Sequence, residues 1–263
     1  MKAKGILGLA ATAWIGWSSY AYAGLVVVND NFEYADQAAF QAVWAPIGTS
    51  APQSAELSTE QFVSGAKSIK VPGATVNNQS RNQLTFAETA AVVDGHLTWS
   101  FMFYDSNPAG NPQRNYANLQ DGTAPSTTPA GQLISLGLNN NLLNSAGVGP
   151  RYMARVLGYD GGSGAGAYFK LNGINDGGAG TERVAGWVEL RVDIYTDHMT
   201  FFVRGKECQT IPVGSRSYDV IRLGSGLSNG STAAYFDDMY LTPEPATVVL
   251  LAVGGLLLRR RRA

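Results

Sequence analysis

A strip of aromatic and charged side chains in the second half of the chain has the composition of a sugar-binding surface. Its members alternate with apolar residues: Trp187, Glu189, Arg191, Asp193 and Tyr195. Because side chains of an extended strand point alternately to its two sides, all five would lie on one side. Aromatic rings can stack on sugar rings, and charged groups can hydrogen-bond sugar hydroxyls. The strip is therefore a candidate carbohydrate site, unless loops or a second sheet cover its rings.

Three aspartates near the two ends of the same region are candidate calcium ligands. They are Asp30, Asp237 and Asp238, and hard carboxylate oxygens suit Ca²⁺. The period-two pattern of residues 235–241 places Asp237 on the apolar side of its segment. A buried carboxylate must be hydrogen-bonded, paired or metal-bound. A structural calcium ion is one alternative, and backbone hydrogen bonds or an arginine partner are the others.

The spacing of the candidate residues shows no recognisable catalytic arrangement. Glu189 and Asp193 are the nearest carboxylates on the strip, and four residues of extended chain separate them by ~13 Å. A retaining glycosidase holds its two carboxyl groups about 5 Å apart. The two histidines, His96 and His198, are too few for a histidine-rich metal centre. No catalytic residue is assigned, and a non-enzymatic protein is the favoured interpretation.

Short segments of alternating apolar and polar residues must position these candidates. The pattern predicts strands over 25–28, 68–71, 83–86, 97–104, 134–138, 152–157, 167–171, 187–195, 199–203, 220–223 and 235–241. Helical spacing occurs only over residues 36–44, while 107–128 and 158–180 have the composition of long loops. Many short strands with turn-rich connections predict an all-β fold, an antiparallel β-sandwich or jelly roll.

The first 23 residues have the three-part layout of a secretory signal peptide. Lys2 and Lys4 precede an apolar run over 5–17, and Ala21 and Ala23 form a small-x-small cleavage site. The run is shorter than the ~20 residues that span a bilayer, which favours a cleaved signal over a retained anchor. We therefore expect a signal-peptide helix that directs export and is cut after Ala23.

The last segment, residues 243–263, combines a Pro-Glu-Pro motif, an apolar run and a basic end. The motif is Pro243, Glu244 and Pro245, and the basic end is Arg259, Arg260, Arg261 and Arg262. The 13 apolar residues between them would extend ~20 Å as a helix, against a hydrocarbon core of ~30 Å. Arginines favour the cytoplasmic side. The pattern predicts a short hydrophobic helix that anchors the chain transiently, with the preceding domain outside.

This order of motifs resembles the PEP-CTERM sorting signal of exported bacterial proteins. The resemblance implies recognition by an exosortase, removal of the tail near the Pro-Glu-Pro motif, and delivery to the cell surface or the extracellular matrix. It covers about the last 21 residues. It concerns the route of export and not the activity of the exported domain.

The ends of the predicted domain carry a second resemblance. Segments 29–34, Asn-Asp-Asn-Phe-Glu-Tyr, and 235–241, Tyr-Phe-Asp-Asp-Met-Tyr-Leu, are similar to the first and last strands of concanavalin A-like, laminin-G-like jelly rolls. The resemblance implies one domain over 24–242, with two stacked antiparallel sheets and carbohydrate or protein binding. Some members of this group are glycoside hydrolases or polysaccharide lyases, so a glycan-active enzyme is the alternative to a binding protein.

Charge narrows the class of partner. The chain has 19 basic and 20 acidic residues, but the two end segments hold six of the basic residues and one acidic residue, which leaves about −6 for residues 24–242. An acidic domain argues against nucleic-acid binding. Together these features predict an exported cell-surface or matrix protein associated with extracellular polysaccharide. A purely structural matrix protein is a further alternative.

Overall fold

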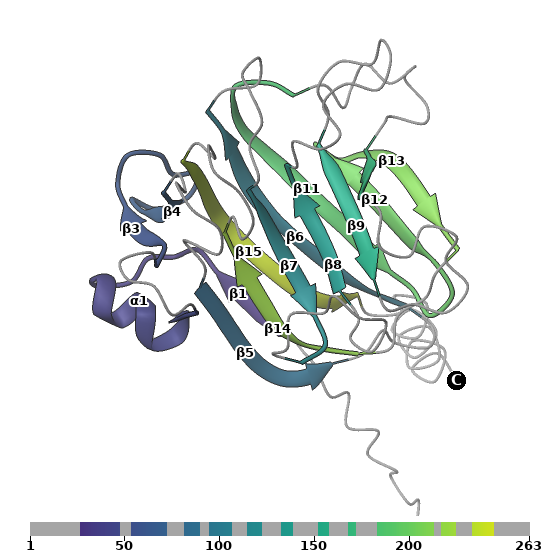
Figure 1. Cartoon of the computed structure of the whole chain (residues 1–263), viewed down its shortest axis with the longest axis horizontal. Coiled ribbons are helices and arrows are strands. Elements are labelled where there is room, and N and C mark those ends of the chain that lie inside the picture. Colours follow the sequence, from purple (N-terminus) through teal and green to yellow (C-terminus); the bar gives the residue numbers. More distant parts are fainter. Residues whose placement is uncertain are drawn as a thin grey trace, which may run out of the picture.

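The computed structural model describes residues 27–47, 54–72, 82–89, 95–106, 115–122, 133–138, 152–157, 168–171, 183–212, 217–224 and 233–244. These residues form two antiparallel β-sheets and one short helix (Figure 1). Within these ranges no helix is long and apolar enough to cross a membrane. The predicted signal peptide and residues 245–263 of the predicted sorting segment lie outside the described residues.

Sheet A holds the first and last of the described strands. Its strands are β1 (Val28–Asp30), β3 (Glu56–Ser58), β4 (Ser68–Val71), β6 (His96–Asp105), β11 (Gly186–Ile194), β12 (Met199–Val203), β13 (Lys206–Ile211) and β15 (Ala234–Glu244). They follow the order β13-β12-β11-β6-β15-β4-β3. On the side of β15 away from β6, β4 pairs with its first half and β1 with its second half.

Sheet B is built from strands in the middle and late parts of the chain. Its strands are β2 (Ala45–Pro46), β5 (Asn82–Thr89), β7 (Tyr116–Gln120), β8 (Leu133–Gly137), β9 (Met153–Leu157), β10 (Tyr168–Lys170) and β14 (Tyr218–Leu223). They follow the order β10-β9-β8-β7-β14-β5-β2. All pairings in both sheets are antiparallel, which confirms the predicted antiparallel β-sandwich.

The core lies between the sheets, where the predicted alternation holds. On β6, the side chains of Leu97, Trp99, Phe101 and Phe103 are fully buried, and the apolar residues of β11 are buried beside them. Ile134 and Leu136 of β8 belong to the same core cluster from sheet B. Each such side chain stabilises the fold by about 1.5–3 kcal/mol relative to leaving it in water.

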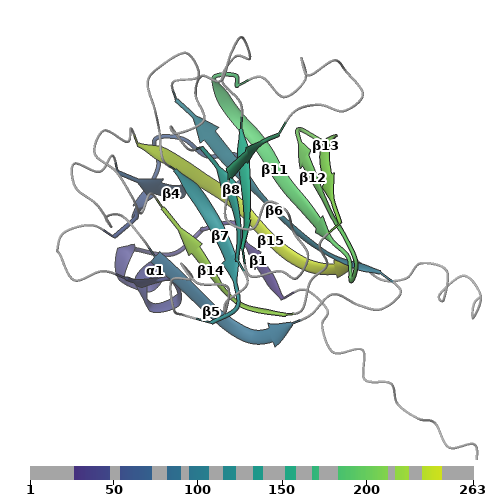
Figure 2. The ribbon, with the colours of Figure 1, turned by 45° about the vertical axis from the view of Figure 1, so that its right-hand side comes forward.

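The helix α1 (Gln37–Val43) lies at one end of the sandwich, beside β2 and β3 (Figures 1 and 2). The side chain of Asp36 accepts a hydrogen bond from the backbone N–H of Ala39 at 2.8 Å and so caps the first turn. Phe40 buries its ring in the core. The helix predicted over 36–44 is therefore present, with Asp36 as its cap.

One sequence expectation about the strands is wrong. Residues 107–128, expected to be a loop, contain β7, which lies at the middle of sheet B and is buried along its whole length. Only Ala117 and Leu119 of this strand point into the core, and two apolar positions among Pro, Ser and Thr residues give too little periodicity to predict a strand. Strand β15 includes Pro243 and Glu244, which pair with Leu97 and His96 of β6.

Candidate functional site

Three aromatic side chains form a row across the side of sheet A that faces away from the core. Trp187 of β11 and Tyr235 of β15 are both register partners of Tyr104 of β6, which lies between them. The ring centroids of Tyr104 lie 5.3 Å from Trp187 and 5.7 Å from Tyr235, at interplanar angles of 71° and 87°. We call these three residues the aromatic row. It runs across the strands, whereas the strip predicted from the sequence runs along one strand.

A hydrogen-bonded ion pair closes one end of the aromatic row. The hydroxyl of Tyr235 donates to Oε2 of Glu60 at 2.5 Å, and Nζ of Lys70 donates to Oε1 at 2.7 Å. Lys70 also lies over the ring of Tyr235, 5.8 Å from its centroid. The bonds from Lys70 and Tyr235 lower the pKa of Glu60, while burial and then the bond to Glu60 raise the pKa of Tyr235. The row thus ends in a fixed carboxylate and a neutral phenol.

The aromatic row is partly accessible. The side chains of Trp187 and Tyr104 are half-buried, whereas Tyr235, held between Tyr104 and Glu60, is only 7% exposed. Edge-to-face aromatic pairs fix one another's orientation. The result is a rigid apolar platform bordered by polar groups, which is the chemistry that binds the face and the hydroxyls of a sugar ring.

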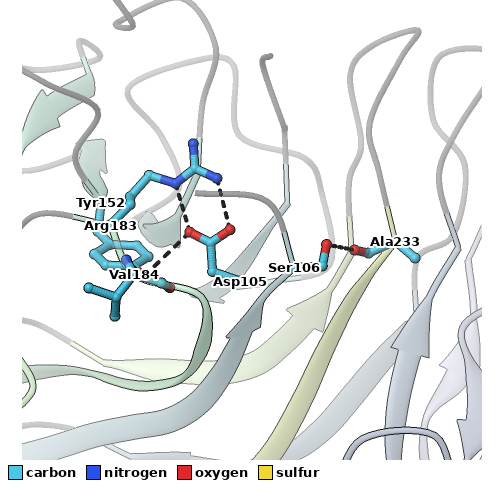
Figure 3. A network of polar contacts seen from close by, with 6 residues as sticks. All are labelled: Asp105, Ser106, Tyr152, Arg183, Val184 and Ala233. Carbon is cyan, nitrogen blue, oxygen red and sulfur yellow. Dashed lines mark hydrogen bonds and ion pairs between the residues drawn. The ribbon is translucent and has the colours of Figure 1, made fainter. Parts of the chain in front are cut away.

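Polar contacts, buried around Asp105 and exposed at Ser106, fix the ends of the three strands that carry the row (Figure 3). Arg183, just before β11, donates from Nε and Nη2 to the two carboxylate oxygens of Asp105 at 2.7 and 2.8 Å, at the end of β6. The hydroxyl of Tyr152 lies 3.4 Å from the same carboxylate. Ser106 donates to the carbonyl of Ala233, just before β15, at 3.3 Å. Because Asp105 directly follows Tyr104 in β6, its hydrogen bonds help to hold the aromatic row in position.

The remaining members of the predicted strip make contacts of their own. Glu189 pairs in register with Met102 of β6. The guanidinium of Arg191 lies 4.0 Å from the ring centroid of Phe202, and its Nε is 3.3 Å from Asp193. Asp193 accepts a hydrogen bond from Thr98 at 3.0 Å. Arg191 and Thr98 thus both contact Asp193 on the outer side of sheet A.

Tyr195, the last member of the strip, lies between the two histidines. Its ring stacks on His198 at 4.1 Å and contacts His96 at 4.7 Å. Of the five predicted residues, only Trp187 therefore joins the aromatic row. Tyr104 and Tyr235 were missed as site residues because alternation gives the side of a strand but not which residues of neighbouring strands stand opposite each other.

Asp30, a predicted calcium ligand, is saturated with hydrogen-bond donors. Its Oδ1 accepts from the backbone N–H of Phe32 at 2.8 Å, and its Oδ2 accepts from the hydroxyl of Tyr34 at 2.5 Å and from Nε1 of Trp44 at 2.7 Å. Phe32 has a positive φ of 57°, so Asp30 stabilises a turn that is unfavourable for a bulky residue. Burial and the bond to Asp30 raise the pKa of Tyr34, which keeps it a neutral donor.

Asp237 shares a side of β15 with Tyr235, as expected, but not with Met239 and Leu241. The pairing of β15 with β6 shifts between Asp237 and Tyr240, so one extra residue stands on β15. This bulge, with Asp238 at φ 44°, puts Asp237 on the side of Tyr235 and returns Met239 and Leu241 to the core. The alternation predicted over 235–241 breaks at this point.

The two carboxylates at the bulge hold the loop that precedes β4. Oδ2 of Asp237 accepts from the backbone N–H groups of Val63 at 2.7 Å and Ser64 at 3.3 Å, and its Oδ1 accepts from the N–H of Asp238 at 2.8 Å. The hydroxyl of Ser64 donates to Asp238 at 2.6 Å. Burial, against these hydrogen bonds, raises the pKa of Asp237 to about 6.

These contacts leave the predicted calcium ligands committed to donors of the protein itself. β1 and β15 are neighbours, as the calcium hypothesis required, with Asp30 opposite Met239. Within the described ranges, however, no three acidic, histidine or cysteine side chains are grouped so that they could hold a metal ion.

Only two of the predicted processing residues lie within the described part of the chain. Pro243 and Glu244 lie in β15, paired with β6. Ala21, Ala23, Pro245 and Arg259 to Arg262 lie outside the described residues. A Gly-x-Ser-x-Gly pattern at residues 226–230 also lies outside them.

Comparison with known proteins supports the fold. The chain matches no protein-family model and no curated protein sequence. Its structure is similar to that of a cellulose induced protein, Cip1, with a TM-score of 0.52 and 16% identity over 82% of this chain and 97% of that one. This similarity shows a shared fold, an antiparallel β-sandwich of the jelly-roll type.

Two weaker structural matches are a carbohydrate esterase and a glucanase. The conserved carbohydrate esterase of the Shiga toxin-encoding bacteriophage phi24B has a TM-score of 0.47 and 13% identity, over 74% of this chain and 89% of that one. The GH131 β-glucanase catalytic domain of Podospora anserina has a TM-score of 0.45 and 14% identity, over 84% and 97%. Neither match is strong enough to bear on function.

Proposed function

We propose that the protein is an exported cell-surface or matrix component that binds extracellular polysaccharide through the aromatic row. The observation that carries the proposal is the register of Trp187, Tyr104 and Tyr235, which places three rings in contact across three strands beside the Glu60–Lys70 pair. The accessible ring surface of Trp187 and Tyr104, bordered by polar groups, suits stacking on the apolar face of a sugar ring.

The route of export completes the proposal. The N-terminal segment directs secretion, and the Pro-Glu-Pro segment anchors the chain until an exosortase removes it. Pulse-chase analysis of the tagged protein tests this part. Two successive losses of mass, the second abolished by changing Pro243, Glu244 and Pro245 to alanine, are expected. A tail that persists in the mature protein contradicts it.

Binding is tested with the signal and tail removed from the gene, as a domain over residues 24–244, on a glycan array with and without Ca²⁺. Affinity electrophoresis then measures the dissociation constant for each hit. Trp187→Ala and Tyr104→Ala are expected to weaken binding by roughly tenfold or more, since each removes a stacking surface. Unchanged binding in both variants refutes the role of the aromatic row.

Tyr195→Ala is the matched control. Tyr195 is an aromatic residue just after the same strand, eight residues or ~26 Å from Trp187, and it stacks on His198 instead of joining the row. We expect it to bind as the wild type does. Equal losses in Tyr195→Ala and Trp187→Ala would mean that the site runs along β11. Release of reducing sugar from a bound glycan would favour the glycan-active enzyme over the binding protein.

A further inference from the structure

A second row of side chains crosses the outer side of sheet A, parallel to the aromatic row. Arg191 of β11 and Tyr240 of β15 are both register partners of Ser100 of β6, and Tyr240 also stands opposite Asn29 of β1. Register partners share one side of a sheet. Ser100 is four residues from Tyr104 of the aromatic row, an even step that keeps both rows on the outer side, ~13 Å apart. We call Arg191, Tyr240 and Asn29 the second row.

The side chains of the second row are accessible. Tyr240 is 37% exposed, Asn29 is exposed, and Arg191 exposes 30% of its side chain. The guanidinium of Arg191 lies 4.0 Å from the ring centroid of Phe202, and this cation–π contact restricts its orientation. The second row therefore offers an accessible aromatic ring beside polar groups, as the aromatic row does.

The bulge of β15 is what brings Tyr240 into the second row. Asp237 pairs with Met102 and Tyr240 pairs with Ser100, so three steps along β15 stand opposite two steps along β6. Without the inserted residue, alternation would turn Tyr240 to the core side. Bulges commonly re-aim a side chain in this way. Here the bulge places an aromatic ring on the same side as the aromatic row.

Glu189 and Met102 lie between the two rows. They are register partners on β11 and β6, and the side chain of each is half-buried. A polysaccharide that followed β6 from the aromatic row to the second row would pass over both. The thioether of Met102 would offer it apolar surface, and the carboxylate of Glu189 would accept hydrogen bonds from its hydroxyls.

The charge along this path disfavours an anionic ligand. The cation of the second row, Arg191, lies 3.3 Å from the carboxylate of Asp193. The cation beside the aromatic row, Lys70, lies 2.7 Å from the carboxylate of Glu60. Glu189 adds a carboxylate that forms no ion pair within the described ranges. A like charge placed over Glu189 would weaken binding, so the path suits an uncharged sugar chain.

We propose that the outer side of sheet A binds a chain of uncharged sugars that reaches from the aromatic row to the second row. Trp187 and Tyr104 stack on one sugar of the chain, Tyr240 and Arg191 bind another, and Glu189 bonds to hydroxyls between them. A single sugar ring is much shorter than the ~13 Å between the rows, so only a chain engages both. The inference rests on the proposed function and names the class of its ligand.

The experiment is calorimetric titration of the full chain, purified in a detergent without sugar groups. The probes are oligosaccharides of about two to eight sugars from cellulose, laminarin, xylan and mannan. In at least one series, wild type is expected to bind the longer members roughly tenfold more tightly than the disaccharide, because they engage two linked sites. Tyr240→Ala should lose most of this gain and keep its affinity for the disaccharide. Tyr240→Phe retains the ring and should bind nearly as the wild type does.

Tyr195→Ala is the matched control, because Tyr195 lies four residues beyond Arg191 and outside both rows. It should keep the full gain with chain length. Should Tyr240→Ala fold poorly, Arg191→Gln removes the other side of the second row and should also lose the gain. Oligogalacturonates of equal length should bind roughly tenfold more weakly than the uncharged chains, and Glu189→Gln should narrow that difference.

Two results would overturn the inference. One is a wild-type affinity that does not rise with chain length, and the other is a tighter binding of the oligogalacturonates. If Trp187→Ala abolished binding at every length while Tyr240→Ala and Arg191→Gln changed nothing, the aromatic row would stand and the second row would fall. A wild type that binds none of the four series would remove both.

Discussion

Removing one partner of the buried ion pair of Arg183 and Asp105 is expected to cost more stability than breaking an exposed pair such as Lys70 and Glu60. Asp105 is fully buried, Arg183 exposes 2% of its side chain, and two hydrogen bonds of 2.7 and 2.8 Å join them. Removing one partner leaves a buried charge without compensation, which costs about 3–5 kcal/mol. Arg183→Met should therefore lower the free energy of unfolding by that amount. This is a large share of a typical total of about 5–15 kcal/mol.

Urea unfolding followed by tryptophan fluorescence measures this change, and thermal unfolding should show a fall of roughly 6–20 °C. The double variant Asp105→Leu with Arg183→Met leaves no unpaired charge and should recover most of the loss. Lys70→Met, which breaks the exposed pair with Glu60, should scarcely move the midpoint. A fall of less than about 1 kcal/mol in the free energy of unfolding of Arg183→Met would refute the reasoning, since exposed ion pairs contribute that much at most.

Three further predictions concern Asp237, Arg204 and calcium. The pKa of Asp237 is raised from 3.8 to about 6, so the folded state binds the carboxyl proton more tightly than the unfolded state does. This tighter binding adds about 3 kcal/mol to the free energy of unfolding below pH ~4, and the addition is lost as the pH rises through 6. Asp237→Asn should remove that part of the pH dependence, measured as the difference from wild type in denaturation midpoints between pH 4 and pH 7. Arg204, with φ 53° in the turn between β12 and β13, should accept asparagine with a gain of up to about 1 kcal/mol, seen as a higher melting temperature; a lower one would contradict the strain argument. Because Asp30 and Asp237 are saturated with donors, the melting temperature should be the same in millimolar Ca²⁺ and in chelator, and a clear rise with Ca²⁺ would reveal a site.

Much of the fold could be predicted because its strands are amphipathic in a simple way. On β11 and β6, every second residue is apolar and buried, and the helical spacing after Asp36 marked α1. Strand β7 could not be predicted, because five residues within a polar segment give too little periodicity.

The sites were harder to predict than the strands because they depend on register. The sequence pointed to Trp187, but its contacts with Tyr104 and Tyr235 follow from pairings across three strands separated by long stretches of chain. The bulge at Asp238 is a second example. Alternation assumes an unbroken ladder, and one inserted residue after Asp237 places Met239 and Leu241 on the side of β15 opposite Asp237.

The position of β15 has a consequence for the order of events during biosynthesis. This strand is the last of the described strands, yet it lies between β6 and the pair β4 and β1, and it contributes Phe236, Met239 and Leu241 to the core. Sheet A therefore cannot close until the chain has been synthesised as far as residue 244, which makes folding slow and non-local. If the chain is exported from its N-terminus as proposed, folding is completed only after β15 has crossed the membrane.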